Sequence, residues 1–442
     1  MATAASRIYF DWNAGAPLSA DARAAVVDAL DGLGNPSSVH GEGRAARARM
    51  ETARRAVGVL AGAPAEAVSF TSGGTEANVT ALSPDMEIDG APVHFERLLV
   101  SAVEHPSVLA GGRFAAADVA TVPVDAFGRV QLDQLEQRLA AVAGPVLVSL
   151  MAVNNETGVI QPIAEAAEIV HRSGGVLHVD AIQAAGRIAL ADVADGADIL
   201  TLSAHKIGGP RGVGAVVRNR PGLRIAPLLS GGGQEGRARA GTENVSGIAG
   251  FGAAAEAARA DLTRSAEIAR LRDWLEAELI TISPDVTVFG ADQPRVCNTT
   301  CFAAPGLSAE TLVIAFDLEG IAVSSGAACS SGKVDASHVL AAMGVDQETA
   351  KGAIRVSLGP TSSAAEVERF LSVWRTLRHR FARRSEQSAS HFDRLRQPAG
   401  LEPATDGETD AGSARNDRSG SVDRHRQVQV RVRHGHSVRE GA

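Results

Sequence analysis

Two stretches, VLHVDAIQ at Val176–Gln183 and DILTLSAHK at Asp198–Lys206, indicate the architecture of this 442-residue chain. Each begins with a run that is apolar almost throughout and ends in polar side chains. A strand that is apolar on both faces is typical of a parallel sheet covered by helices on both sides. In such sheets, ligands bind beyond the carboxyl ends of the strands. We therefore expect Asp180 and Lys206 to lie on the same edge of one sheet.

Similar apolar runs lie before these two stretches, and segments with a helical period separate the runs. The runs are Ala67–Thr71, Arg97–Val103 and Val146–Val153, and the helical patterns include Gln131–Ala141 and Ile163–Arg172. Strands that alternate with helices predict parallel βαβ units. We therefore expect a large α/β domain with a mostly parallel, mixed sheet over residues 14–257.

The pattern after residue 257 predicts a second, smaller α+β domain. A long helical pattern at Glu243–Leu279 leaves the large domain, and shorter segments follow it. The strand-like segments are 286–289, 295–302 and 352–358, and the helical ones are Ser308–Leu318 and Ser363–Phe381. We assign residues 1–13 and 258–384 to this domain. Two more helices are expected near the N-terminus, at 19–33 and 43–60.

The composition changes at Ser385. Acidic, arginine, serine, glycine and histidine residues are abundant from there on, and Phe392 is the single aromatic residue. Such a segment buries too little apolar surface to offset the conformational entropy lost on ordering. We therefore predict a disordered tail over residues 385–442, and we assign it no function.

The composition limits which side chains are available for catalysis and indicates the cell compartment. Only three of the 43 basic residues are lysines, and the chain has three cysteines, an odd number that argues against a disulfide scaffold. Residues 1–10 lack the basic start and apolar run of a secretory signal, and no apolar stretch is long enough to span a bilayer. The net charge of -8 gives no reason to expect a nucleic-acid partner. We expect a cytoplasmic protein without membrane or nucleic-acid contacts.

The pairing of Asp180 with Lys206 is the most informative feature of the sequence. Taken singly, Asp180 could cap a helix and Lys206 could be a surface lysine. An aspartate and a lysine at neighbouring strand ends are, however, what pyridoxal phosphate requires. The lysine forms a Schiff base with the aldehyde, and the carboxylate keeps the pyridine nitrogen protonated so that the ring accepts electrons.

A phosphate site is predicted where a strand runs through two glycines into a helix, in FTSGGTEA at Phe70–Ala77. Backbone amides at a helix N-terminus, together with the Gly74 and Thr75 positions, suit an anion. Ser203 and His205 could add donors. The alternative is ordinary turn and cap chemistry at this helix start.

His105, in SAVEHPS at 101–107, is a candidate for stacking on a cofactor ring and for moving protons near neutral pH. The alternative is a capping or core histidine, because a histidine before proline is biased to extended geometry and marks a helix start.

Cys329 lies in a loop rich in small residues, SSGAACSSGK at 324–333, where an accessible thiol is a candidate nucleophile. Cys297 and Cys301 fall in a strand-like run and are expected to be buried and inert, and their spacing is a poor zinc signature. Arg355 interrupts an apolar strand, and burial of its guanidinium requires an anionic partner. That partner is either a substrate carboxylate or an internal Asp or Glu.

From residue 8 to about residue 384 the sequence resembles the cysteine desulfurases of the class V aminotransferase family, in their nitrogen-fixation and iron-sulfur-cluster branch. The resemblance implies fold type I of the pyridoxal-phosphate enzymes. The matching motifs, in chain order, are IYFDWNA at 8–14, GNPSSVH at 34–40, TSGGTE at 71–76, NNETG at 154–158, SAHK at 203–206, GGGQE at 231–235, RAGTEN at 239–244 and SSGAAC at 324–329.

The resemblance implies pyridoxal 5'-phosphate as cofactor and a homodimer as the active form. Lys206 would carry the cofactor, Asp180 would pair with the pyridine nitrogen, and His105 would stack on the ring. Gln183 and Asn155 would bond the ring oxygen. The phosphate would be held by Gly74, Thr75, Ser203, His205 and, from the other subunit, Thr242.

The resemblance also implies the substrate and the reaction. Arg355 and Asn35 would bind the carboxylate of L-cysteine, and the Cys329 thiolate would attack the substrate sulfur. L-alanine and a persulfide on Cys329 would result, and the persulfide would pass to an iron-sulfur scaffold or another sulfur acceptor. No intrinsic metal site is expected, although Cys329 could transiently ligate a nascent iron-sulfur cluster.

Three alternatives remain open on the sequence. The same fold serves aminotransferases, which would not need Cys329, and selenocysteine lyases. The third alternative is a non-catalytic scaffold or regulatory relative, which would be expected to lack Lys206, Asp180 or Cys329.

Overall fold

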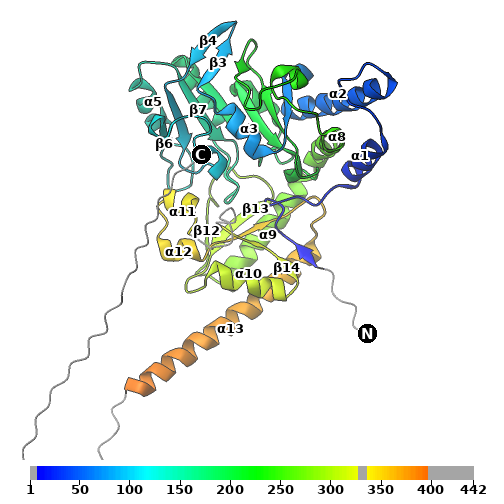
Figure 1. The fold of residues 1–442 in the computed structure, drawn as a ribbon. Helices are drawn as coiled ribbons and strands as arrows, with labels where there is room; N and C mark the ends of the chain where they lie inside the picture. Colours follow the sequence, from blue (N-terminus) through cyan, green and yellow to red (C-terminus); the bar gives the residue numbers. More distant parts are fainter. Residues whose placement is uncertain (1–6, 327–335, 397–442) are drawn as a thin grey trace, which may run out of the picture. The chain divides into compact units, whose positions relative to one another are not determined.

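The computed structural model describes residues 7–326 and 336–396, with side chains up to residue 381 (Figure 1). Among these residues, seven strands form the largest sheet, in the neighbour order β2-β10-β9-β8-β7-β5-β6. Their bounds are β2 Val68–Thr71, β5 Arg97–Ser101, β6 Val119–Val122, β7 Val146–Met151, β8 Val176–Asp180, β9 Ile199–Ser203 and β10 Gly214–Arg218. β10 pairs antiparallel with both β2 and β9, and the other described pairs of this sheet are parallel. The predicted mostly parallel, mixed sheet is confirmed.

The central strands of this sheet are buried on both faces. Every residue of β7, β8 and β9 is buried. Alternate residues enter different cores: Leu147 and Val176 pack in one apolar cluster, whereas Val148 and Leu177 pack in another. Burial of both faces explains why the strands are mostly apolar rather than alternating between apolar and polar residues.

Helices connect the strands and pack beside the sheet. In chain order they are α1 Ala20–Asp31, α2 Gly41–Ala61, α3 Gly74–Ala81, α4 Pro106–Leu109, α5 Leu132–Ala140, α6 Ile163–Arg172, α7 Ala191–Gly196 and α8 Val245–Asp261. Helices α1 and α2 both pack against α8, next to one another at one side of the sheet (Figure 1). The N-terminal helices therefore belong structurally with the large sheet.

A smaller antiparallel sheet has the order β12-β13-β16-β15. Its strands are β12 Thr287–Val288, β13 Thr299–Ala303, β15 Ser324–Ser325 and β16 Ile354–Ser357. Nearby lie a parallel pair, β1 Ile8–Tyr9 with β14 Ile321–Ala322, and the helices α9 Ser265–Ile282, α10 Ala309–Leu318, α11 His338–Ala342, α12 Gln347–Lys351 and α13 Ala364–Arg396. The first strand of the chain thus joins elements that lie more than 300 residues later.

Aromatic side chains dominate the core beside the smaller sheet. The rings of Phe316 and Phe370 stack with centroids 4.7 Å apart, and Phe302 meets Trp374 edge-on at 5.4 Å. Both α13 residues of these pairs are fully buried. Buried rings in such geometries contribute beyond the area that they remove from water.

Two helical predictions differ from the structure. The pattern at 243–279 is not one helix: a short 3-10 turn at Leu262–Arg264 separates α8 from α9. There, Thr263 Oγ1 donates to Ala260 O at 2.8 Å, a local bond of the kind that competes with helical pairing. Helix α13 also continues to Arg396, past the residue where we placed the start of the tail.

The structure contains a β-hairpin that the sequence patterns did not predict. Strands β3 Asp85–Ile88 and β4 Ala91–His94 pair around Asp89 and Gly90, which both have positive φ, and β11 Arg224–Ile225 extends this small sheet. Asp-Gly between two short strands is the signal of a type I′ turn. Within the described residues, no helix is long and apolar enough to cross a membrane.

Candidate active site

The structure brings Asp180 and Lys206 to the same edge of the large sheet. Asp180 is the last residue of β8, and Lys206 ends the 3-10 turn that follows the neighbouring strand β9. Both line a cavity of about 280 Å³. Ten residues predicted for the site line it together: Gly74, Thr75, His105, Asn155, Asp180, Gln183, Ser203, His205, Lys206 and Arg355.

Asp180 is a buried carboxylate held by neutral donors. Asn78 Nδ2 donates to one oxygen at 2.8 Å and the Ile182 N–H to the other at 3.0 Å. Among the described residues it forms no ion pair, and burial raises its pKa, although both hydrogen bonds, His105 and Lys206 act in the opposite direction. A carboxylate in this position lacks a cation in contact, and a protonated pyridine nitrogen would supply one. The site therefore fits the ring of pyridoxal phosphate.

A chain of buried polar groups crosses the sheet and ends at Asp180. Ser149 Oγ lies 2.8 Å from His178 Nδ1, and His178 Nε2 lies 3.1 Å from Thr201 Oγ1. Thr201 Oγ1 then donates to Asn78 Oδ1 at 2.6 Å. Burial lowers the pKa of His178 to about 3, so this histidine is neutral and orients Asn78, which in turn holds Asp180.

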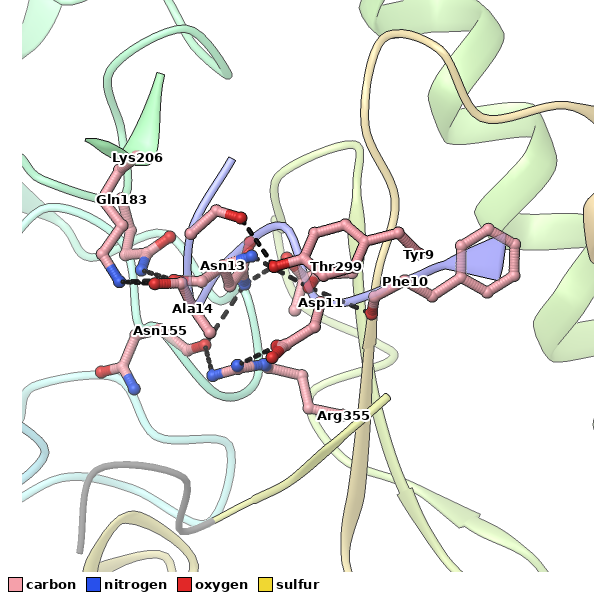
Figure 2. A network of polar contacts seen from close by, with 12 residues as sticks. Tyr9, Phe10, Asp11, Asn13, Ala14, Asn155, Gln183, Lys206, Thr299 and Arg355 are labelled. Carbon is pink, nitrogen blue, oxygen red and sulfur yellow. Dashed lines mark hydrogen bonds and ion pairs between the residues drawn. The ribbon is translucent and has the colours of Figure 1, made fainter. Parts of the chain in front are cut away.

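Lys206 points back to the N-terminal segment of the chain (Figure 2). Its Nζ donates to the backbone carbonyls of Asn13 at 2.7 Å and Ala14 at 3.0 Å. Gln183 Nε2 also donates to the Asn13 carbonyl, at 3.0 Å. Gln183 Oε1 is buried and has no hydrogen-bond partner among the described residues, so it is available to a ligand group in the cavity.

Asn13 is the centre of this network and was not predicted as a site residue. It is 2% exposed, and its amide uses its full capacity of two donors and two acceptor positions. Its Nδ2 donates to Asn155 O at 3.2 Å and Thr299 Oγ1 at 2.9 Å. Its Oδ1 accepts from Arg187 Nη2 and Asn298 Nδ2, both at 3.1 Å. Only the motif match at 8–14 hinted at this residue.

The expected phosphate end of the cavity is formed by the start of α3 and by the turn after β9. A Cβ on Gly74 would lie 2.5 Å from Ile182 Cδ1 and 3.3 Å from Ser203 Cβ, so the backbone there is closely packed. Ser203 Oγ lies 2.8 Å from His205 Nδ1. Burial, with Lys206 and Arg211 nearby, lowers the pKa of His205 to about 4. At neutral pH His205 is therefore a neutral donor or acceptor.

His105 both caps a helix and faces the cavity. Its Nδ1 accepts from the Ser107 N–H at 3.1 Å and lies 2.8 Å from Ser107 Oγ, so the capping alternative is observed. Asn78 Nδ2 donates to the same Ser107 hydroxyl at 2.9 Å, which links His105 to the support of Asp180. Burial lowers the pKa of His105, and Lys206 and His338 add to this effect against the opposing charge of Asp180.

Arg355 extends from β16 to the cavity and forms an ion pair with a carboxylate of the same chain. Its Nη2 donates to Asp11 Oδ1 at 2.8 Å and its Nη1 to Asn155 O at 3.1 Å (Figure 2). The Asp pair that the sequence left as an alternative is therefore present. The Nε group is buried and unpaired among the described residues, so the guanidinium keeps a donor for another anion.

Two buried glutamates beside the cavity were missed. Glu156 accepts from Ser337 Oγ, and burial raises its pKa to about 7. Glu104 accepts from the Met151 N–H at 2.6 Å, and burial raises its pKa well above the usual range. Both stand inside quoted motifs, SAVEHPS and NNETG, but nothing in their spacing indicates burial.

Three predicted residues are not part of the cavity. Asn35 is exposed, and its side chain accepts from the Ser37 N–H at 2.8 Å. Thr242 is exposed as well. Cys329 lies outside the described residues. Of the other cysteines, Cys301 is fully buried and Cys297 is half-buried, and burial raises the pKa of both thiols.

The fold and the cavity agree with the result of comparison with known families. The model of the class V aminotransferases matches residues 8–370, and this chain belongs to that family. One relative is the cysteine desulfurase of Cereibacter sphaeroides, which is 42% identical over 83% of this chain and 94% of the relative. Another is the cysteine desulfurase of Sinorhizobium fredii, which is 40% identical over 83% of this chain and 95% of the relative. A solved NifS-like protein from Rickettsia africae superposes with a TM-score of 0.75 at 33% identity, over 84% of this chain and 99% of that one.

Proposed function

We propose that this protein is a cysteine desulfurase that uses pyridoxal 5'-phosphate to convert L-cysteine to L-alanine, with the sulfur left as a persulfide on Cys329. The observation that carries the proposal is the juxtaposition of Lys206, Asp180 and the unpaired Gln183 oxygen in one cavity. Relatives named cysteine desulfurase, aligned over most of both chains, support it.

Different residues of the cavity would contact different parts of the cofactor. Asp180 would pair with the pyridine nitrogen, Gln183 and Asn155 would bond the ring oxygen, and His105 would cover the ring. The phosphate would be bound by Gly74, Thr75, Ser203 and His205. When bound, the cofactor supplies an electron sink that makes the α proton of the substrate removable.

Lys206 is placed to exchange protons during the reaction. The carbonyls of Asn13 and Ala14 accept hydrogen bonds only, so they stabilise the protonated amine and hold it at the wall of the cavity. A neutral Nζ at this wall can take the α proton, and the two carbonyls then stabilise the resulting ammonium until it returns the proton. His105, neutral because its pKa is lowered, is a second group that can carry a proton at the same wall.

Arg355 would bind the substrate carboxylate, assisted by Asn35. Its buried Nε and its place in the cavity wall support this role, and Asp11 keeps the guanidinium in position. The Cys329 thiolate would then attack the substrate sulfur. The electrons of the breaking carbon–sulfur bond pass to the substrate carbon, which gains a proton to give alanine.

We further propose a homodimer in the cytoplasm that hands the persulfide to an iron-sulfur scaffold or another acceptor. Exposed apolar residues on and after α1 support a subunit contact, namely Val27, Leu30, Leu33 and Val39. Thr242 is exposed and therefore accessible to the site of a second subunit. Unpaired thiols at Cys297 and Cys301 suit a reducing compartment.

The test is to compare the Cys329→Ser and Lys206→Ala variants with the native protein. Cys329→Ser should lose sulfide release from L-cysteine while it retains the visible absorbance of bound cofactor. Lys206→Ala should change that absorbance and abolish activity. If Cys329→Ser kept full activity with L-cysteine, the desulfurase proposal would be wrong. Faster release from L-selenocysteine would favour a lyase, and transfer of the amino group to a keto acid an aminotransferase.

A further inference from the structure

A second cavity, of about 360 Å³, lies next to the candidate active site. Among the described residues that line the two cavities, Lys206 is the only one that they share. The walls of the second cavity come from the segment between β1 and α1, the turns after β8 and β9, the end of α8, the start of α9, the residues before β13 and those after β16. It therefore lies where the elements of the large sheet meet those of the small sheet.

Arg187 stands in the wall of this cavity without a carboxylate. It is 9% exposed, and its guanidinium donates to neutral oxygens, from Nη1 to Gln183 O at 2.9 Å and from Nη2 to Asn13 Oδ1 at 3.1 Å. Burial lowers its pKa to about 10. Among the described residues it forms no ion pair, so a buried positive charge is left uncompensated.

Three other arginines with largely buried side chains, among the described residues, are compensated. Arg54 pairs with Glu235 at 2.6 Å, Arg295 with Glu276 at 2.8 Å, and Arg355 with Asp11 at 2.8 Å. These pairs follow the general rule that a buried guanidinium is matched by an anion. Arg187 departs from this rule, and it lines the second cavity.

The remaining wall is mostly apolar and provides no internal anion for Arg187. Trp12, Leu18, Ile207, Ile268 and Leu358 contribute to it. Asp261 is the one carboxylate among the described lining residues, but the charged group that acts on its pKa is Arg264. Burial has the largest effect on the pKa of Arg187, and the charged groups that also act on it are Cys297, which raises it, and Arg355, which lowers it.

We propose that this cavity binds a small monocarboxylate with an apolar body, with the carboxylate on Arg187 and the body against the apolar wall. A planar guanidinium binds a carboxylate through two parallel hydrogen bonds, and an apolar enclosure strengthens them. The site is coupled to Lys206 because both side chains bind Asn13, Arg187 at the amide oxygen and Lys206 at the carbonyl. The proposal is independent of the desulfurase activity, because it concerns binding alone.

The test is a calorimetric titration of the full-length, cofactor-loaded protein with benzoate. Fluorescence of Trp12, in the cavity wall, gives a second readout. Benzoate should bind saturably, and uncharged benzamide should bind at least about tenfold more weakly, as expected for loss of a charged hydrogen-bond partner. Absence of saturable binding up to about 10 mM, where even a millimolar site fills, would overturn the proposal.

Variants separate the two cavities. Arg187→Gln should weaken benzoate binding at least about tenfold, whereas the matched change Arg355→Gln, in the other cavity, should affect it much less. Ala257→Phe, which fills the cavity while Arg187 stays in place, should also abolish binding and guards against misfolding of the Arg187 variant. If Arg355→Gln removed binding and the other two changes did not, benzoate would occupy the active site and the proposal would be wrong.

Discussion

Replacing Asn13 by alanine should destabilise the protein and loosen the hold on Lys206. The change removes four side-chain hydrogen bonds at a position that is 2% exposed. A typical net contribution is about 1 kcal/mol for each bond, and a buried donor left without a partner costs about 1–3 kcal/mol. Water that enters the space restores part of this. We therefore expect a loss of about 3 kcal/mol in the free energy of unfolding.

Urea denaturation and thermal melting of the apoprotein measure the stability change without any contribution from turnover. Affinity for added pyridoxal phosphate, followed by its visible absorbance, measures the effect on Lys206, and we expect it to fall about tenfold. Asn13→Asp is the conservative comparison. It keeps the acceptor for Arg187 and Asn298 but loses both donors, so it should recover part of the stability.

A double-mutant cycle with Asn298→Ala tests the network itself. Asn298 Nδ2 donates to Asn13 Oδ1, so the two alanine changes remove one bond in common. The double variant should lose less stability than the sum of the single variants, by about 1 kcal/mol. Strict additivity, or an Asn13→Ala protein that melts like the native one, would refute the account of Asn13 as the centre of the network.

Three further predictions concern buried groups around the cavity. Burial raises the pKa of Glu156 from 4.5 to about 7 in the folded protein. Between these pH values the folded state keeps a proton that the unfolded state has released. The free energy of unfolding therefore falls as the pH rises through this range. Glu156→Gln should remove this fall, of about 3 kcal/mol, in urea titrations at pH 4.5 and pH 8, and an unchanged pH profile would contradict it. Gly74→Ala should lower affinity for pyridoxal phosphate about tenfold because the new Cβ would meet Ile182 and Ser203. The control Gly73→Ala should leave the affinity unchanged because the space around its Cβ is open. Equal effects of the two changes would argue against the packing explanation. Asp180→Asn should lower sulfide release at least about a hundredfold while the fold, monitored by circular dichroism, persists; near-native release would remove Asp180 from the site.

The sequence was sufficient for the sheet edge that carries the chemistry. The mostly apolar runs that end at Asp180 and Ser203 predicted both strand ends, because the last, polar residue of such a run lies at the carboxyl end of the strand. Lys206, Gln183 and His205 then follow from chain continuity. These residues are placed by local geometry, which is what sequence patterns encode.

The support of the site could not be predicted in the same way. Asn13 meets Thr299 and Arg187 through contacts between distant segments, and Glu156 meets Ser337, which lies 181 residues later. Asp11, likewise, pairs with Arg355 across 344 positions. No periodicity records such contacts, because they depend on how the two sheets come together. The break between α8 and α9 was missed for a simpler reason, since LTR contains neither Gly nor Pro.

The long-range pairing of the N-terminal segment has a consequence for the order of events during protein synthesis. Asp11 and Asn13 leave the ribosome early, but their partners Arg355 and Ser357 are translated 344 residues later. At about 5–20 residues per second, this delay is roughly 20–70 s. Lys206 is translated within this interval, 149 residues before Arg355, so it is complete while the small-sheet partners of the segment that holds it are still missing. Cofactor captured before β16 is translated would therefore meet an incomplete pocket, and stable loading should follow the synthesis of that strand.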